Sequence, residues 1–239
     1  MEQLDYILVP LGIALFISYN FWLLFAILRY PKRTVIGLNA ESRRQWVFSM
    51  MSDPLKNGVL IVQTLRNNIM ASSLMATAAI TLCSLISVQV SNKAGFPNLS
   101  SEIGKGYKRF VASSSVKLLS ILICFLFAFI CNVQSVRYYA HVSFLATLPT
   151  SKDRKESIEY VISNLSRGSY FWSLGLRAFY FSFPLFIWLF GAIPMFLSCC
   201  VISFVLYFLD TTSLCTQLLH SHSMNGESVI AIDVDALEG

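Results

Sequence analysis

The feature that most constrains the fold is an apolar stretch from Tyr170 to Leu209, in which Arg177 is the one charged residue. As a single helix, at ~1.5 Å per residue, it would be about 60 Å long, twice the ~30 Å hydrocarbon core of a bilayer. Gly191 and Pro194 interrupt it near its middle, and glycine and proline are the strongest local helix breakers. The stretch is therefore predicted to form two membrane spans that meet in a tight turn at a membrane face.

The composition favours lipid rather than water as the solvent of this chain. Only 13% of the residues are charged and 55% are hydrophobic, whereas soluble domains usually carry about 25% charged residues. Three further apolar segments are long enough to cross a bilayer. The predicted fold class is an all-α integral membrane protein with about five transmembrane helices, of which the last two form a Gly/Pro hairpin. The predicted spans are residues 6–28, 69–88, 118–136, 173–190 and 194–209.

The segments between the spans predict cytosolic amphipathic helices and one loop. Residues 40–51 read as a short helix at the bilayer surface, and Asp53-Pro54 is a start signal for a helix that continues into the second span. Residues 151–167 carry apolar side chains on one helical face and charges on the other. Residues 91–117 are predicted to be a loop, rich in Gly, Pro and Ser, that holds a glycosylation sequon at Asn98.

The distribution of Lys and Arg predicts the orientation. The first and third connections hold seven and five such residues, the second holds five, and none precedes the first span. The positive-inside rule then places the N-terminus and Asn98 outside. The expected location is a plasma membrane or an endomembrane. Residues 1–210 form the helical membrane domain, and the acidic tail 211–239 is expected to be largely disordered and cytosolic. If 170–190 lay along the interface instead of spanning, the tail would be outside.

The second span lacks aromatic residues and is rich in small ones. Small residues four apart allow close helix packing in lipid, as for the pairs Ser72/Ala76 and Ser73/Thr77. This span is expected to pack against other helices or against its own copies in a homo-oligomer. Packing only against neighbours within one protomer is the alternative.

Arg177 is the sharpest single feature, because an Arg at the bilayer centre costs ~2.5 to 3.5 kcal/mol on insertion scales. Ser173, Arg177 and Tyr180 lie on one face of the predicted helix. That face is a candidate lining for a hydrated path with a positive charge that attracts anions. The alternative is a structural role, in which Arg177 snorkels to headgroups or pairs within the protein. Asp210 is interpreted as the water-facing end of the last span.

Two more polar clusters lie at predicted cytosolic mouths of spans. Arg66, Asn67 and Asn68 precede the second span, and another group lies at the end of the third span, from Asn132 onward. Together with Arg177 they predict either a basic vestibule or a site for anionic lipid headgroups, and each alone is typical of an interfacial anchor. The second group consists of Asn132, Arg137, Tyr138 and His141.

Several classes of function lack the residues that they need. The chain has no Gly-rich phosphate loop, nucleophile elbow, paired carboxylates or helical His pair, so we expect no enzyme activity and no cofactor. The six cysteines do not show metal or disulfide spacing, and no metal site is predicted. Lys and Arg flank apolar runs rather than forming a basic stripe, which argues against nucleic acid. The expected partners are the lipid bilayer, further copies of the chain and anionic headgroups.

Four motifs resemble one known family. The chain carries Tyr30–Gly37 (YPKRTVIG), Arg66–Ser72 (RNNIMAS), Arg137–His141 (RYYAH) and Gly175–Phe181 (GLRAFYF), the last leading to Trp188–Gly191. In these motifs it resembles the plant branch of an uncharacterised membrane family, number 599 in the domain-of-unknown-function series. Many members have Gly-Pro where this chain has Gly-Ala, which loosens the turn. The resemblance implies a multi-span protein and implies no activity.

Five spans leave too little protein for a transporter built from two repeats with a site between the halves. A path would instead form between protomers, with the second span near the axis. The function predicted first is an oligomeric ion channel or passive conductor with a basic, anion-attracting cytosolic mouth. The alternative is a non-conducting membrane scaffold or adaptor that recruits a cytosolic partner.

Overall fold

The computed structural model describes residues 2–94, 104–147 and 154–211, and this part of the chain consists of helices joined by short turns, with one isolated bridge between Thr34 and Thr211. Four of its helices are long and apolar enough to cross a membrane, which fits the predicted all-α membrane class. They are α1, α3, α4 and α6. The elements are α1 (Glu2–Arg29), the 3-10 turn η1 (Pro31–Arg33), α2 (Val35–Ser52), α3 (Pro54–Ala94), α4 (Gly104–Leu145), α5 (Arg154–Ile187) and α6 (Ala192–Asp210).

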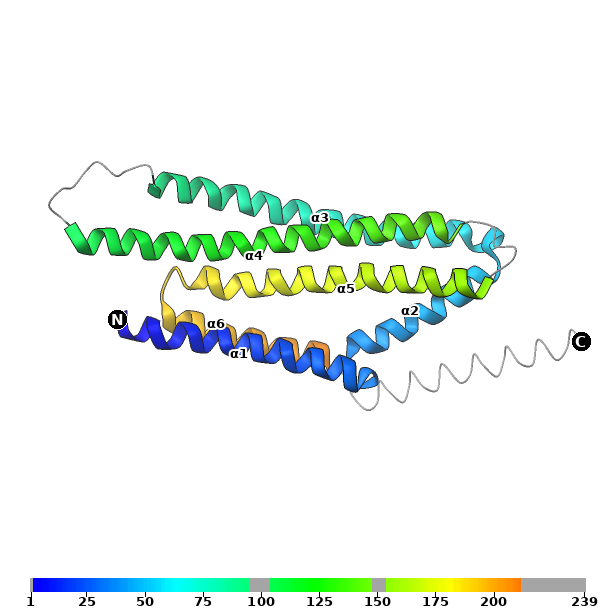
Figure 1. Ribbon diagram of the computed structural model, residues 1–239, viewed down its shortest axis with the longest axis horizontal. Coiled ribbons are helices and arrows are strands. Elements are labelled where there is room, and N and C mark those ends of the chain that lie inside the picture. The colour runs from blue at the N-terminus through cyan, green and yellow to red at the C-terminus, as the bar shows by residue number, and fades with distance from the viewer. Residues whose placement is uncertain (1, 95–103, 148–153, 212–239) are drawn as a thin grey trace, which may run out of the picture.

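The five long helices form one antiparallel bundle (Figure 1). The long helices are α1, α3, α4, α5 and α6, and each of the last four runs opposite to the long helix before it. Helix α5 lies between α4 on one side and α1 with α6 on the other. The short helix α2 connects the end of α1 to the start of α3 at one end of the bundle, which we call the α2 end. The opposite end, where α5 connects to α6, is the turn end.

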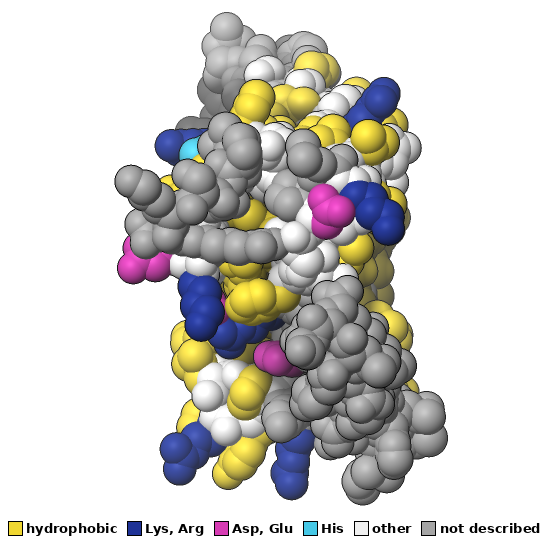
Figure 2. Space-filling model, turned by 90° about the vertical axis from the view of Figure 1, so that its right-hand side faces the viewer, with side chains coloured by type: hydrophobic (Ala, Val, Ile, Leu, Met, Phe, Trp, Pro, Cys, Tyr) yellow, Lys and Arg dark blue, Asp and Glu magenta, His cyan; other side chains and the backbone are white. Residues whose placement is uncertain are grey.

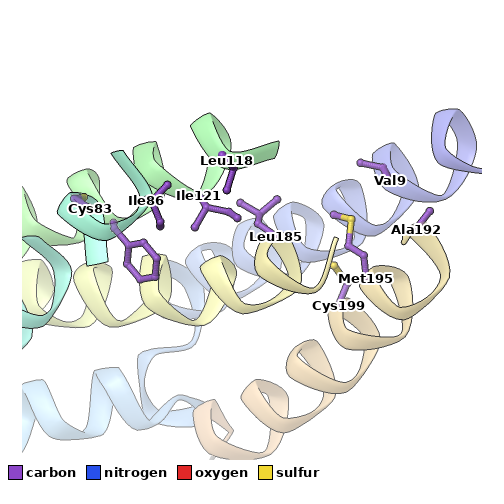
Figure 3. Packing of buried hydrophobic residues seen from close by; sticks show 10 residues of the cluster. Val9, Cys83, Ile86, Leu118, Ile121, Leu185, Ala192, Met195 and Cys199 are labelled. Atoms are coloured by element: carbon purple, nitrogen blue, oxygen red, sulfur yellow. The ribbon is translucent and has the colours of Figure 1, made fainter. Parts of the chain in front are cut away.

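An apolar core near the turn end holds together all five long helices (Figure 3). Met195 and Cys199 of α6 are fully buried, at 0% exposure, and lie close to Val9 of α1. Burying such side chains is worth about 1.5–3 kcal/mol each in water, and in lipid the close packing itself has to supply the association. The other fully or nearly buried members are Cys83, Ile86, Leu118, Ile121, Phe125, Leu185 and Ala192.

A second core lies at the α2 end, where α2 packs against the adjoining halves of α3, α4 and α5. Neither α1 nor α6 contributes a buried residue to it. The three helices α3, α4 and α5 therefore continue beyond the ends of α1 and α6 and build a separate four-helix unit with α2 (Figure 1). Its buried residues are Val47, Met51, Ile61, Leu65, Tyr139, Val142, Ala146, Ile158, Val161 and Leu165.

Several predicted boundaries are confirmed. The helix predicted to start at Asp53-Pro54 does so, with the Asp53 carboxylate accepting the Lys56 backbone N–H at 3.2 Å, and it continues through the second span without a break. The helix predicted for residues 40–51 is part of α2. The last two apolar segments are joined by a tight turn at Gly191, whose φ of 149° lies outside the range that other residues readily adopt.

Two predicted boundaries are wrong. The loop expected at 91–117 is much shorter, because α3 extends to Ala94 and α4 already begins at Gly104. The amphipathic helix expected at 151–167 and the span expected at 173–190 form one helix, α5. Between them only Gly168 weakens the helix, and its cost of about 1 kcal/mol is too small to end a helix packed along its whole length. The Asn98 sequon and the tail 212–239 lie outside the described residues.

Small residues set the close approach of α5 to α4. Gly168, Gly175 and Ser182 are seven residues apart on α5, so they lie on one helical face, and all three are buried. A Cβ added at Gly175 would lie 2.6 Å from Nδ2 of Asn132 and 3.4 Å from the Ala128 carbonyl oxygen of α4. The two helices therefore use the small-residue packing that is typical of membrane helices.

Replacing Gly175 with Ala is expected to lower the free energy of unfolding in detergent by about 1–2 kcal/mol, because the new methyl group overpacks this contact. In an Asn132→Ala background the same change should cost clearly less, since the amide that it strikes is gone. Equal costs in both backgrounds would contradict the packing role assigned to this glycine.

Candidate functional site

A polar cluster joins α1, α5 and α6 near the end of α6. Arg177 donates from one terminal nitrogen to Asp210 Oδ2 at 2.8 Å and from the other to Asn20 Oδ1 at 3.3 Å. The Tyr19 hydroxyl donates to the same Asp210 oxygen at 2.6 Å. The ion pair is largely shielded from solvent, with 15% of the Arg177 side chain and 12% of the Asp210 side chain exposed.

The packing of α1 on α5 brings these residues together. The rings of Phe16 and Phe181 stack with centroids 4.7 Å apart. Because the two helices are antiparallel, one turn further along α1 and one turn back along α5 bring Asn20 opposite Arg177. Asp210 is the last residue of α6, where a negative charge opposes the helix dipole, so the guanidinium offsets an otherwise unfavourable position.

The structure therefore corrects the interpretation of Asp210 as a water-facing helix end, because the residue is 8% exposed and paired. Two roles were open for Arg177, the lining of a hydrated path and a structural role. The observed contacts of Arg177 are those of structural pairing. Its charge is matched by a carboxylate, so Arg177 does not present an unpaired positive charge. One feature of the sequence points to this pair, since Arg177 and Asp210 are the only charged residues of the segment from Tyr170 to Asp210.

The Tyr30–Gly37 motif forms a tight turn next to this cluster, between the end of α1 and the start of α2, which we call the elbow. Thr34 is buried at 1% exposure, and its hydroxyl donates to the Pro31 carbonyl at 3.0 Å and accepts the Gly37 N–H at 3.2 Å. Its backbone forms the bridge to Thr211, the residue directly after Asp210. The motif thus positions the end of α6 against the start of α2.

A second polar layer crosses α3, α4 and α5. The hydroxyl oxygens of Ser72 and Ser135 are 3.3 Å apart, and Ser135 also donates to the Gly168 carbonyl at 2.9 Å. Asn132 is fully buried and donates to the Ala128 carbonyl at 2.8 Å, while its Oδ1 has no hydrogen-bond partner among the described residues. These contacts place Ser72 and Ala76 on the face of α3 that packs within the protomer.

The other predicted site residues do not gather around Arg177. Arg66, Asn67, Arg137 and His141 are exposed, and Asn68 is half-buried. Lys and Arg side chains are spread around the α2 end of the molecule (Figure 2). The remaining three are half-buried: Tyr138 stacks on Phe171 with centroids 5.6 Å apart, Ser173 donates to the Ser169 carbonyl, and Tyr180 lies on the same face as Ser173 and Arg177.

One face of α3 has no partner among the described helices and carries hydroxyl groups. Three of them donate to the carbonyl one turn back: Thr77 to Ser73, Thr81 to Thr77 and Ser84 to Ile80, at 2.8–2.9 Å. Such bonds use the hydroxyl proton and leave oxygen lone pairs free to accept. We call this set, with Ser73, the α3 hydroxyl face; its members are Ser73, Thr77, Thr81 and Ser84, and all four are exposed.

The described residues contain no group of three or more His, Cys, Asp or Glu side chains placed to hold a metal ion. Neither curated proteins nor solved structures show a significant match to this chain. Its motifs nevertheless place it in one family, as their resemblance predicted. Residues 7–214 match the family described as "Protein of unknown function, DUF599", and because the match covers most of the sequence, the chain belongs to that family.

Proposed function

We propose that this protein is an oligomeric ion channel, or a related passive conductor, in which copies of α3 surround the path. The observation that supports this most is the α3 hydroxyl face. Its four hydroxyl residues point away from the protomer, on a helix that lies at the edge of the bundle (Figure 1). Hydroxyl oxygens that still accept hydrogen bonds suit a water-filled path better than they suit lipid tails.

The outward faces of the other edge helices differ in chemistry. The most exposed side chains of α6 are large and apolar, between 59% and 65% exposed at Leu197, Val201, Phe204 and Phe208. The outward face of α1 is similar, with Leu11 at 53% and Phe25 at 61%. These surfaces suit lipid, whereas α3 combines Leu and Val with a line of hydroxyls. The contrast favours α3 as the helix that contacts its own copies.

Arg66 extends the α3 hydroxyl face at the α2 end. It precedes Ser73 by seven residues and Ser84 by eighteen, spacings that keep all three on one side of a helix. Arg66 is exposed, and the residues described here give it no carboxylate partner. In an assembly around α3, a ring of Arg66 side chains forms the basic, anion-attracting mouth, in place of the paired Arg177.

The proposal includes the topology expected from the sequence. With α5 counted as a span, which makes five in all, the N-terminus is outside and the C-terminal tail is cytosolic, in a plasma membrane or an endomembrane. The antiparallel order of the long helices supports this, since α5 runs beside α4 across the full bundle (Figure 1). We also propose, from the resemblance of its motifs, that the chain comes from the plant branch of the family.

Planar bilayers containing the purified full chain test the channel proposal. We expect a current that falls severalfold in Thr77→Val, which removes one hydroxyl per copy with little change of shape, and an anion preference that weakens or reverses in Arg66→Glu. Thr147→Val is the matched control, because Thr147 also donates to a carbonyl one turn back but lies in the turn that follows α4. Its current should equal that of the wild type.

Absence of current under variation of voltage, calcium and pH, in preparations with intact helicity, would overturn the channel proposal. That result would favour the non-conducting scaffold. Equal effects of Thr77→Val and Thr147→Val would likewise remove α3 from the path.

A further inference from the structure

Arg43 lies on the inward face of α2. Arg43, Val47 and Met51 are spaced four residues apart, which places them on one side of the helix, and Val47 and Met51 are each 2% exposed in the core at the α2 end. Its Nε is buried and has no hydrogen-bond partner among the described residues. This arginine is therefore held against the protein rather than in solvent.

Among the described residues, the groups that act electrostatically on Arg43 are phenols rather than carboxylates. The side chains that interact with it electrostatically are Tyr139 of α4, which is buried, and Tyr170 of α5, which is 45% exposed. Burial lowers the pKa of the Arg43 guanidinium from its ordinary value, and the two phenol groups act in the opposite direction. Withdrawing a cation from water without an opposite charge is costly, so an external anion would stabilise this arrangement.

The neighbouring Arg44 shows the contrast. It pairs with Glu159 at 2.6 Å, and the two side chains are 50% and 51% exposed. The exposed Arg44 is thus paired with a carboxylate. Among the described residues, the more buried Arg43 interacts only with the hydroxyl groups of tyrosines.

The level of this cluster along the bundle indicates the kind of anion. Tyr170 precedes Arg177 by seven residues, about 10 Å along α5 toward the α2 end at ~1.5 Å per residue. Arg177 contacts the end of α6, a helix whose full length is needed to cross a membrane. A lipid headgroup layer extends about 5–8 Å beyond the hydrocarbon core on each side. With the end of α6 at the edge of the hydrocarbon core, Tyr170 therefore lies at the outer, water-facing edge of the headgroup layer.

We propose that Arg43, Tyr139 and Tyr170 form a binding site for a phosphate group, supplied by the headgroup of an anionic phospholipid. The planar guanidinium binds phosphate oxygens through paired N–H donors, and each phenol supplies one O–H donor. Tyr170 is the exposed side of the site, through which a headgroup enters from the lipid. The site does not depend on conduction, so its test and the channel test can fail separately.

Native mass spectrometry and thermal unfolding of the full chain in lipid nanodiscs test the site. Nanodiscs with phosphatidic acid or phosphatidylinositol phosphate should raise the unfolding temperature above that in phosphatidylcholine, and one anionic lipid per chain should remain bound. Arg43→Gln should weaken this binding roughly tenfold or more, since it removes a charge-assisted contact. Arg44→Gln makes the same change of charge on the exposed neighbour and should weaken it less than about twofold.

Inorganic phosphate and inositol phosphates added to the detergent-solubilised chain distinguish a free ligand from a lipid. Stabilisation by these soluble anions, but not by the lipids, would overturn the headgroup assignment. Equal losses in Arg43→Gln and Arg44→Gln would reduce the effect to general surface charge and overturn the site. If Arg43→Gln fails to fold, Tyr170→Phe serves instead, and wild-type chain that shows no preference for anionic lipid also contradicts the proposal.

Discussion

Replacing Asp210 with Ala is expected to lower the free energy of unfolding in detergent by about 3 kcal/mol, because it leaves the guanidinium of Arg177 shielded from water without a counter-charge. The same change removes the acceptor of the Tyr19 hydroxyl. Urea or SDS titration of purified protein, followed by circular dichroism, measures the loss. Glu159→Ala breaks the exposed pair with Arg44 and should cost less than about 1 kcal/mol, so it controls for the mere removal of an acidic residue.

A double-mutant cycle separates the ion pair from other effects at the two positions. Arg177→Met replaces the charge with an apolar chain of similar length. In that background, Asp210→Ala should cost at least about 1 kcal/mol less than in the wild type, because no uncompensated cation remains. Costs that simply add would contradict the pairing and would return Arg177 to the role of a headgroup-snorkelling side chain.

Helical periodicity did not predict the tertiary partners of Arg177. Periodicity identifies which residues share a helical face, and the helix that it predicted around Arg177 is part of α5. The contact of Tyr19 with Asp210, however, joins residues 191 positions apart in the sequence. It depends on the stacking of Phe16 on Phe181, which fixes how α1 sits on α5. Such a register follows from the fit of side chains, which local periodicity does not contain.

The ends of the helices show the same division between local and tertiary causes. The turn at Gly191 was predictable because Gly and Pro act on the backbone locally. The continuity of α5 was not, because the break expected near Gly168 rested on a change from an amphipathic to an apolar pattern. In the structure the N-terminal part of α5 packs into the core at the α2 end and its C-terminal part into the core at the turn end. Each half is thus stabilised in helical form by a different core.

The small residues of α3 lie on two different faces of the helix, one packed inside the bundle and one exposed. The pair Ser72/Ala76 packs within the protomer, whereas Ser73/Thr77 points outward. Packing within one chain and packing against copies of the chain were expected as alternatives for the whole set. The structure assigns the first pair to internal packing, and the second pair remains available for a copy of the chain.

The second large effect is expected at Gly37. A Cβ built there would lie 2.2 Å from the Pro31 carbonyl oxygen and 2.7 Å from its carbon. That carbonyl is fixed by both the backbone N–H and the hydroxyl of Thr34, so it cannot swing away as a flexible side chain would. Gly37→Ala should therefore open the elbow, separate Thr34 from Thr211 and lower the free energy of unfolding by about 3 kcal/mol, the upper end for an overpacked site.

Gly58→Ala is the matched control, because a Cβ at this position in α3 meets nothing within 4 Å. Gly58 lies in the second turn of α3, and inside a helix this change should instead stabilise the protein by about 0.5–1 kcal/mol, since Ala loses less backbone entropy than Gly. The two substitutions add the same methyl group and should act in opposite directions in the same denaturation assay. If Gly37→Ala were tolerated as well as Gly58→Ala, the elbow would not be closed as described. The Tyr30–Gly37 motif would then not be what holds the end of α6 against α2.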